Sequence, residues 1–447
     1  MFLVKIFAFL ALPIFLFASN LDFTLHKKGE DKNESILLVI GGIQGDEPGG
    51  FNAASLLVTH YKITKGSVWV VPNLNFNSIV ERSRGLFGDL NRKFAHIEKD
   101  DPEYSTIERI KSAILDERVD MVLNLHDGSG FYRDSYIDEM RNPNRWGQSC
   151  IVDQEQIEHE KYGELSKIAE DVKEHVNKNL LDSEHIFGVR NTRTSEGDEE
   201  MAKSLTYFAI QNNKPAFGIE GSKSFDTPFR TYYHLLALER YMQIMGIEYE
   251  RGFEMSPVAI KNAIEDSAQK VVLYDNKFLL PIKDVRNYLK FIPVKKDSDI
   301  EYTADHPLLA IVKKDKDYRI YYGNKGVASL SPEYLEYDDS LNTIDVNIDG
   351  SEKVVSFGSM IDVKSNFLVK SKKGYRVNII GFLNPKKTSE ADIIVKKSNI
   401  MNSFSVDKKE RIYRVEIYKD DKFSGMFLVN FDEKATTNSP QVASIKE

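Results

Sequence analysis

Three short segments of the sequence carry side chains that could bind a ligand or transfer a proton. The Gly-rich segment GGIQGDEPGG places Gln44 and Glu47 three residues apart, a spacing that can turn both side chains toward one point. His126 directly follows the apolar run MVLNL and precedes a Gly/Ser loop. Glu220 follows the apolar residues of KPAFGI and lies between glycines, where a carboxylate is either capped or paired, or a base in a cleft.

Taken singly, each segment also has a purely structural explanation. Glu47 and Pro48 could form only the first turn of a helix, since proline is favoured at the first helical position and a carboxylate is favourable beside it. A histidine at a strand end could simply bond to the neighbouring Asp127. The joint order of the segments, rather than any one of them, therefore carries the functional interpretation.

The elements that must position these residues follow from the apolar pattern of the first 250 residues. Four short, β-rich runs predict strands covered on both faces: Ile36–Ile40, Val68–Val71, Met121–Leu125 and Ala216–Ile219. Amphipathic segments between them predict helices: Pro48–Tyr61, Thr106–Asp116, Gln154–Leu181 and Pro228–Met245. This alternation predicts an α/β domain with a largely parallel or mixed sheet. His126 and Glu220 should lie at the carboxyl edge of that sheet, where open α/β folds bind ligands.

Beyond about residue 250 the pattern changes to alternating strands separated by turn residues such as Asp-Asn and Lys-Lys-Gly. We predict a small β domain over residues 250–335 and an immunoglobulin-like β-sandwich with a polar tail over residues 336–447. The α/β domain then spans residues 20–249.

The first 19 residues have the layout of a secretory signal peptide. Met1–Lys5 is a short positive start, Ile6–Phe17 is apolar, and Ala18–Ser19 are small. The 12-residue apolar run is shorter than the ~20 residues that span a bilayer, so we expect no membrane span after cleavage. An uncleaved N-terminal anchor is the alternative, and either way the chain should lie outside the cytoplasm. Cys150 is the only cysteine, which excludes an internal disulfide.

Charge and composition exclude several classes of protein. The 447 residues include 60 Lys and Arg against 68 Asp and Glu, a formal net charge of −8. We expect no nucleic-acid partner, because phosphate binding needs a basic surface. A hydrophobic content of 41% excludes a disordered chain, and the length suggests about three domains.

Taken in chain order, the motifs resemble those of the zinc metallocarboxypeptidase family, the funnelins, over roughly residues 34–246. In that family a His-x-x-Glu loop and a distant strand-end His bind zinc. An arginine polarises the scissile carbonyl, an Asn-Arg pair holds the terminal carboxylate, and a late Glu is the general base. The resemblance implies Glu47 and His126 as zinc ligands, Arg84 as oxyanion partner, Asn91 and Arg92 as carboxylate clamp, and Glu220 as base.

Gln44 departs from the family pattern, because it stands where the family usually has a zinc-binding His. A neutral amide oxygen in place of a neutral imidazole leaves the charge of the site unchanged, although it is a weaker zinc donor. The Gln, the signal peptide and the two β domains together resemble the D,L-carboxypeptidases that trim muramyl tripeptides and determine cell shape in helical epsilonproteobacteria. This narrower resemblance implies Zn²⁺ as cofactor and a periplasmic location.

Three further residues bear on the site. Arg82 competes with Arg84 for the oxyanion role. The two lie on the same face if this stretch is extended and on different faces if it is helical, so the sequence leaves the choice open. Trp146, after the loop RNPNRWG, either walls the substrate or is buried in the fold. Thr206 lies in the region where the family usually has a substrate-facing tyrosine, and we expect it to contact substrate.

The leading hypothesis is therefore an exported zinc carboxypeptidase that removes meso-diaminopimelate from peptidoglycan stem tripeptides and so influences cell shape. The β domains would offer surfaces to other cell-shape proteins. A deacylase of acyl amino acids on the same fold is one alternative, disfavoured by export. A non-catalytic peptidoglycan-binding scaffold is the other, motivated by Gln44 and disfavoured by the presence of both Glu47 and Glu220.

Overall fold

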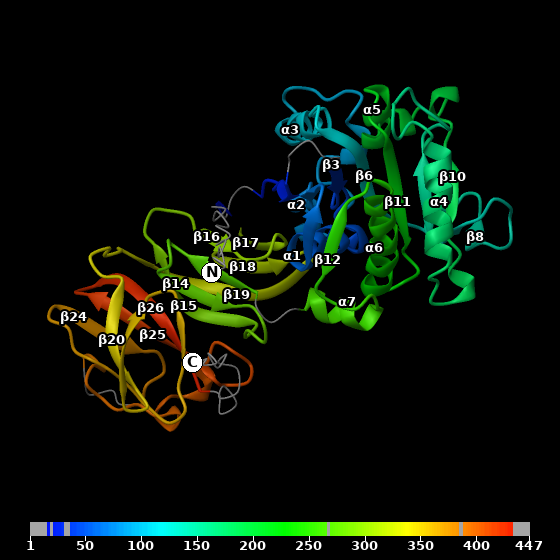
Figure 1. Cartoon of the computed structure of the whole chain (residues 1–447). Coiled ribbons are helices and arrows are strands. Elements are labelled where there is room, and N and C mark those ends of the chain that lie inside the picture. Colours follow the sequence, from blue (N-terminus) through cyan, green and yellow to red (C-terminus); the bar gives the residue numbers. More distant parts are fainter. Residues whose placement is uncertain (1–15, 18–20, 31–35, 266–268, 384–387, 432–447) are drawn as a thin grey trace, which may run out of the picture.

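The computed structural model describes residues 16–17, 21–30, 36–265, 269–383 and 388–431. The predicted signal peptide and the polar tail lie outside these ranges, except for strand β1 (Leu16–Phe17), which pairs with β16 (Glu301–Ala304). Figure 1 shows an α/β part joined to two β parts. Among the described residues, none of the helices combines the length and the hydropathy that a transmembrane span requires.

A seven-stranded mixed sheet, with the order β10-β9-β11-β6-β3-β5-β2, forms the centre of the α/β part. Its strands are β2 (His26–Gly29), β3 (Ile36–Ile40), β5 (Ser67–Val71), β6 (Val119–Gly128), β9 (Ser149–Val152), β10 (Gly188–Asn191) and β11 (Ala216–Ser222). The four apolar runs of the sequence are the adjacent parallel strands β11, β6, β3 and β5, which confirms the predicted mixed sheet. Their carboxyl ends consequently meet at one edge.

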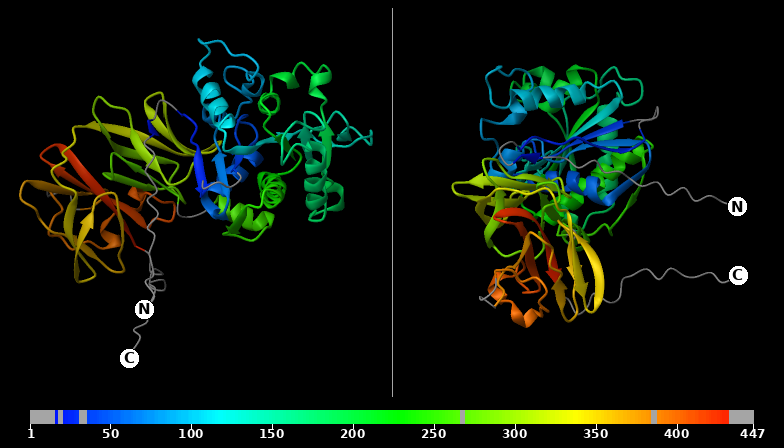
Figure 2. Two further views of the ribbon diagram at one scale, coloured as in Figure 1. Left: turned by 45° about the horizontal axis from the view of Figure 1, so that its top comes forward. Right: turned by 90° about the vertical axis from the view of Figure 1, so that its left-hand side faces the viewer.

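Helices cover both faces of this sheet (Figures 1 and 2). On one face, α6 (Thr227–Ile244) packs against three other helices: α1 (Pro48–His60), α4 (Leu165–Asn177) and α7 (Pro257–Ile264). On the other face, α3 (Tyr104–Ile114) and α5 (Leu205–Gln211) contact β6. Buried apolar side chains of α7, a helix that the sequence pattern did not predict, join the core of this part.

The helix predicted over Gln154–Leu181 is much shorter in the structure, where α4 spans only Leu165–Asn177. Its buried face, at Leu165, Ala169, Val172 and Val176, has the spacing of one helical stripe. The segment before it folds as a loop because its backbone closes on itself, with the Ile157 N–H donating to the Gly163 carbonyl at 2.9 Å. The other three predicted helices are confirmed to within two residues at each end.

The middle β part contains two sheets. The first has the strand order β1-β16-β13-β14, and the second has the order β15-β19-β18-β17. Their remaining bounds are β13 (Lys270–Leu273), β14 (Phe278–Pro281), β15 (Tyr288–Lys295), β17 (Leu309–Lys314), β18 (Asp317–Tyr322) and β19 (Lys325–Leu335). Before it, β12 (Glu248–Arg251) pairs with β4 (Tyr61–Lys65) of the α/β part.

The C-terminal part is a β-sandwich of a three-stranded and a four-stranded sheet, ordered β21-β20-β23 and β22-β26-β25-β24. Its strands are β20 (Thr343–Ile348), β21 (Ser351–Ser356), β22 (Met360–Asp362), β23 (Phe367–Val369), β24 (Tyr375–Ile379), β25 (Ile412–Lys419) and β26 (Lys422–Asn430). Alternate residues of β26 face two cores: Phe427 and Val429 face the sandwich, whereas Met426 and Leu428 face the middle part. The boundaries predicted at residues 249 and 335 stay predictions.

The middle β part packs against the two helices that flank the Gly-rich loop and the arginine segment. Phe51 of α1 and Ile79 of α2 (Phe76–Glu81) form a small apolar cluster with Leu308 and Tyr321 of the middle part. Polar contacts reinforce it, including Ser55 Oγ to His306 Nε2 at 3.2 Å. The middle part therefore holds α1 and α2 from the side away from the main sheet.

Candidate active site

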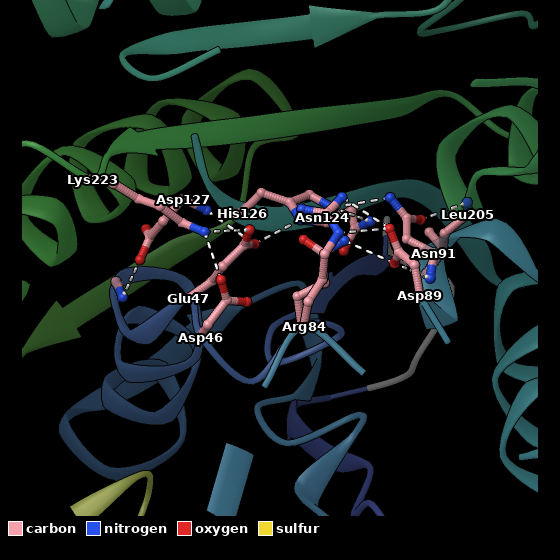
Figure 3. A network of polar contacts seen from close by, with 12 residues as sticks. Asp46, Glu47, Arg84, Asp89, Asn91, Asn124, His126, Asp127, Leu205 and Lys223 are labelled. Carbon is pink, nitrogen blue, oxygen red and sulfur yellow. Dashed lines mark hydrogen bonds and ion pairs between the residues drawn. The ribbon is translucent and has the colours of Figure 1, made fainter. Parts of the chain in front are cut away.

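A cavity of about 260 Å³ opens at the carboxyl edge of the parallel strands. All nine residues predicted from the sequence to form the site line it: Gln44, Glu47, Arg84, Asn91, Arg92, His126, Trp146, Thr206 and Glu220. The structure thus brings together segments that are up to 176 positions apart in the sequence (220 − 44). Figure 3 shows several of these side chains converging from separate elements.

The Gly-rich loop after β3 turns sharply enough to present Gln44 and Glu47 to this cavity. Gly42 has a φ of +74°, and a side chain at Gly45 would overlap the backbone of Ser78 in α2, so the loop needs both glycines. Glu47 is the N-cap residue of α1, with Pro48 next to it. Its carboxylate, however, accepts from the Asp127 backbone N–H at 3.1 Å and contacts His126, so it faces the cavity rather than the helix.

His126 and Glu220 are neighbours on two parallel strands. They lie directly opposite each other in the register of β6 and β11, so both side chains leave the sheet on the same face. The structural alternative of a His126 to Asp127 bond is wrong. The Asp127 carboxylate instead accepts from Gly49 N–H at 2.8 Å and pairs with Arg230 and His234, both at 3.1 Å.

His126 and Glu47 present two basic atoms to the same point. His126 Nδ1 lies 2.9 Å from Glu47 Oε2, while His126 Nε2 lies 2.8 Å from the Asn124 side-chain amide. Asn124 Oδ1 is buried without a partner, and a 180° turn of that amide lets this oxygen accept from Nε2–H. In the tautomer with the proton on Nδ1, that N–H donates to Glu47 Oε2. In the other tautomer the Nδ1 lone pair faces the Glu47 carboxylate, and a cation would be needed between these two acceptors.

Gln44 supplies a third potential donor to the same wall of the cavity. Its Nε2 donates to Asp89 Oδ1 at 2.8 Å, which leaves Oε1 as the atom available to the cavity. In the described part of the chain, no three His, Cys, Asp or Glu side chains gather at metal-binding distances. The donors that fit a cation here are one amide oxygen, one carboxylate and one imidazole, all within the known ligand range of zinc.

The structure distinguishes Arg84 from Arg82. Arg84 lines the cavity, and its guanidinium makes a two-point ion pair with Asp89 Oδ2 through Nε and Nη2, each at 2.9 Å. Arg82 ends α2 in the left-handed conformation, with φ of +55°, and donates from Nε to the Asn324 carbonyl of the middle β part at 2.6 Å. Arg84 is therefore the arginine of this segment that reaches the cavity.

Asn91 and Arg92 lie on a single turn of 3₁₀ helix, η1 (Leu90–Arg92), capped by Asp89. The Asn91 side-chain oxygen accepts from the Leu205 backbone N–H at 3.0 Å, so its amide nitrogen points the other way, where it lies 3.4 Å from His126 Nε2 at the cavity. Arg92 pairs with Glu200 at 3.3 Å, across the loop before α5. Both side chains thus offer donors, which suit an anion.

Trp146 and Thr206 occupy other parts of the cavity wall. Trp146 is half-buried and lines the cavity, and the Arg190 guanidinium stacks on its ring at 3.8 Å; its contact with substrate stays a prediction. Thr206 is buried on the first turn of α5, where its hydroxyl lies 3.1 Å from Ser204 Oγ.

Sequence reasoning missed three polar residues that belong to this site. Lys223 lines the cavity and pairs with Asp46 at 2.8 Å and with Glu47 at 3.4 Å. Its position three residues after Glu220 was the available signal. Asn124 contacts His126, and Asp89 contacts Gln44. Of these two, Asn124 could have been found from the sequence, because it lies two positions before His126 on the same strand face, whereas Asp89 had no such signal.

Burial and neighbouring charges change the proton affinity of two of these groups. Burial, together with the Glu47 and Asp127 carboxylates, raises the pKa of Glu220 to about 8, against the opposing effect of His126. Burial lowers the pKa of His126, but its bond to Glu47 and the nearby carboxylates outweigh this and raise it overall. A cation bound between Glu47 and His126 would favour the ionised Glu220 carboxylate.

The cavity at the carboxyl edge of this mixed α/β sheet is lined by carboxylate, imidazole and guanidinium groups, and the family match identifies the class of protein as a carboxypeptidase. Residues 3–265 match the family described as carboxypeptidase controlling helical cell shape, catalytic, and the chain belongs to this family. Residues 337–432 match a second description, the C-terminal domain of metallo-carboxypeptidase. The family therefore implies a metal, and the donors around Glu47 and His126 fit one.

Solved structures of the cell shape determinant protein Csd4 from Helicobacter pylori are similar to this chain over nearly its whole length. The apo form is 38% identical with a TM-score of 0.88, covering 92% of this chain and 100% of the Csd4 chain. A tripeptide-bound form is 38% identical with a TM-score of 0.87 and the same coverage. The mDAP-bound form of Csd4, described as a D,L-carboxypeptidase, is 39% identical with a TM-score of 0.87, covering 91% and 100%. No curated protein matches the chain.

Proposed function

We propose that the protein is a zinc-dependent D,L-carboxypeptidase that removes terminal meso-diaminopimelate from peptidoglycan muramyl tripeptides and leaves dipeptides. The observation that carries the proposal is the convergence of metal donors, a carboxylate base and anion-binding donors on one cavity. The tripeptide-bound and mDAP-bound forms of the similar Csd4 structures support this choice of substrate.

In this proposal Gln44, Glu47 and His126 hold the zinc ion. One carboxylate and two neutral ligands leave a net positive charge, as in other catalytic zinc sites with His and Glu ligands. When bound, the metal supplies a Lewis acid that polarises the scissile carbonyl and acidifies the attacking water. Asn124 would accept from His126 Nε2–H and fix the ring with Nδ1 toward the metal.

Glu220 is the proposed general base. It takes a proton from the attacking water and returns it to the nitrogen of the leaving amine, which makes departure of the terminal residue possible. Its position beside His126 in the strand register puts it on the metal side of the cavity. Arg84 would donate to the oxygen that becomes negative as the carbonyl carbon turns tetrahedral.

The Asn91-Arg92 turn is the proposed clamp for the terminal carboxylate. A guanidinium fork matches the two oxygens of a carboxylate, and the amide nitrogen of Asn91 adds a third donor. Asp89 and Leu205 hold this turn from both sides, so the clamp is rigid before substrate arrives. Such an arrangement favours cleavage at a chain end. Trp146 and Thr206 would contact the rest of the terminal residue.

We propose a periplasmic location, because the substrate is cell-wall peptide and the sequence begins with a secretory layout. The two β parts would then serve two purposes. The middle part supports α1 and α2 beneath the site, and the outer surfaces offer contacts to other cell-shape proteins.

Purified protein should convert muramyl tripeptide to dipeptide, and chromatography of the reaction mixture measures this conversion. Chelator should stop the reaction and added zinc should restore it. The control substrate is the same tripeptide with its terminal carboxyl converted to an amide, which removes the anion that the clamp binds and should slow turnover by about ten-fold or more. Cleavage of acyl amino acids instead would favour a deacylase, and no turnover with zinc present would favour a binding scaffold.

Gln44→Ala should lower zinc affinity by about 10-fold or more, because loss of a residue that only orients a ligand typically costs about 10- to 100-fold and this change removes a proposed ligand itself. The measurement is zinc competition against a chromophoric chelator, with thermal unfolding of the metal-free protein to monitor the fold. Asn52→Ala, on α1 beyond the cavity lining, is a control for changes in this segment. Unchanged zinc affinity in Gln44→Ala would remove Gln44 from the metal site.

A further inference from the structure

One carboxylate, that of Asp89, contacts three separate parts of the proposed machinery. Asp89 Oδ1 accepts from Gln44 Nε2 at 2.8 Å and from the Asn91 backbone N–H at 3.0 Å. Its other oxygen, Oδ2, receives the Arg84 guanidinium at 2.9 Å. Figure 3 shows Asp89 beside Arg84 and Asn91.

The bond to Gln44 determines which atom of the amide faces the metal position. A glutamine side chain can present either its oxygen or its NH₂ group by rotating its terminal amide, and the NH₂ group is a donor with no lone pair to offer a metal. An anionic acceptor on one side fixes the NH₂ group there and turns Oε1 to the other side. A histidine ligand depends less on a neighbour to select its donor atom, since either ring nitrogen can carry the lone pair that binds a metal.

The same bond makes the amide oxygen a better donor. An N–H group that donates to a carboxylate polarises the amide and increases the negative charge on its oxygen. Outer partners of metal ligands act in this way, by orienting the ligand and raising its basicity. Gln44 is a weaker ligand type than His, so it depends more on such a partner.

The bond to Arg84 fixes the direction of the guanidinium. Arg84 is half exposed, and a long side chain in that setting loses conformational entropy when it is held in one rotamer. The two-point contact of Nε and Nη2 with Asp89 Oδ2 removes this cost before substrate binds. The remaining guanidinium N–H groups stay available to an oxygen in the cavity.

We propose that Asp89 is a positioning residue that turns the Gln44 amide oxygen toward the metal and holds Arg84 ready for the oxyanion. This inference rests on the proposed function, because it assumes that Gln44 binds the metal. It goes beyond it by naming the residue that makes an amide usable as a ligand here. A role limited to capping η1 is the competing explanation.

Asp89→Ser separates the two explanations. A serine hydroxyl still caps the Asn91 N–H, since Ser and Asp are comparable capping residues. The serine side chain is one bond shorter than that of aspartate, so its hydroxyl cannot reach Gln44 and Arg84 in their present positions. Asp101→Ser is the matched control, because Asp101 also accepts from the N–H two residues ahead, at Glu103, and pairs with a cation, Lys93, away from the cavity.

The experiment is a double-mutant cycle on zinc affinity with wild type, Gln44→Ala, Asp89→Ser and the double variant, measured by chelator competition. Asp89→Ser should weaken zinc binding by about 10- to 100-fold in the wild-type background. In the Gln44→Ala background it should cause no further loss, because the amide through which it acts is gone. The unfolding temperature of the metal-free protein should change no more in Asp89→Ser than in Asp101→Ser.

Two outcomes would overturn the inference, and they differ from failure of the proposed function. If Gln44→Ala weakens zinc binding but Asp89→Ser does not, Asp89 has no positioning role. Equal losses from Asp89→Ser in both backgrounds would mean that it acts on the fold and not through Gln44. If Gln44→Ala itself leaves affinity unchanged, the proposed metal site fails first, and the inference fails with it.

Discussion

Glu220→Gln should reduce kcat for tripeptide cleavage by about 10²- to 10⁴-fold, the usual contribution of a positioned general base. The amide has nearly the same shape but cannot take the proton of the attacking water or deliver it to the leaving amine. Because Glu220 lies beside His126 in the strand register and is not one of the proposed ligands, zinc affinity should stay within about three-fold of wild type.

The measurement is turnover of saturating tripeptide by zinc-loaded protein, with metal content checked in the same sample. Glu248→Gln, a substitution of an exposed glutamate on β12 paired with Lys65, is the matched control and should leave turnover unchanged. Wild-type turnover in Glu220→Gln would exclude this residue as the base. A parallel loss of bound zinc would instead make it part of the metal site.

Arg84→Ala should lower kcat by about 10²- to 10³-fold, a loss typical for removal of one oxyanion donor. The oxygen that Arg84 would bind carries a full negative charge only as the tetrahedral centre forms. The loss should therefore appear equally in kcat and kcat/KM, with little change in KM. Arg84→Lys should recover only part of the rate, since an ammonium lacks the two-point fork that meets Asp89.

Arg82→Ala is the informative control because Arg82 lies two residues away and has the same charge. Its guanidinium contacts the Asn324 carbonyl on the middle β part, so its removal should affect stability more than turnover. Steady-state kinetics of the three variants with tripeptide measures turnover, and thermal unfolding of the same samples measures stability. A larger loss of kcat in Arg82→Ala than in Arg84→Ala would reverse the assignment.

Much of the scaffold was predictable because its signals are local. The apolar runs of β3, β5, β6 and β11 are short and uninterrupted, as expected for strands buried on both faces. Helix lengths were less predictable. Residues 154–164 are polar enough for an exposed helix, yet the chain forms a loop there because backbone bonds around Gly163 replace the helical ones.

Helix α7 was missed for a different reason. Its eight residues follow a Ser cap and begin with a proline, both of which are helix-start signals, but it lies where the sequence pattern was already changing to strands. Its buried side chains pack on the α/β core formed much earlier in the chain. A short amphipathic segment of this kind becomes a helix only because that surface is present.

The sequence, with its family resemblance, was enough to name nine of the residues that meet at the cavity, although Lys223, Asn124 and Asp89 were missed. Strand-end residues can be placed without knowing any tertiary contact, because adjacent parallel strands align their carboxyl ends, and this brings together the Gly-rich loop, His126 and Glu220. That Arg84 and not Arg82 reaches the cavity is visible in the folded structure alone, since it depends on a contact of Arg82 with Asn324 across 242 positions. The folded structure alone also revealed Asp89 behind Gln44, 45 positions away, because hydrogen bonds between side chains depend on exact packing rather than on local pattern.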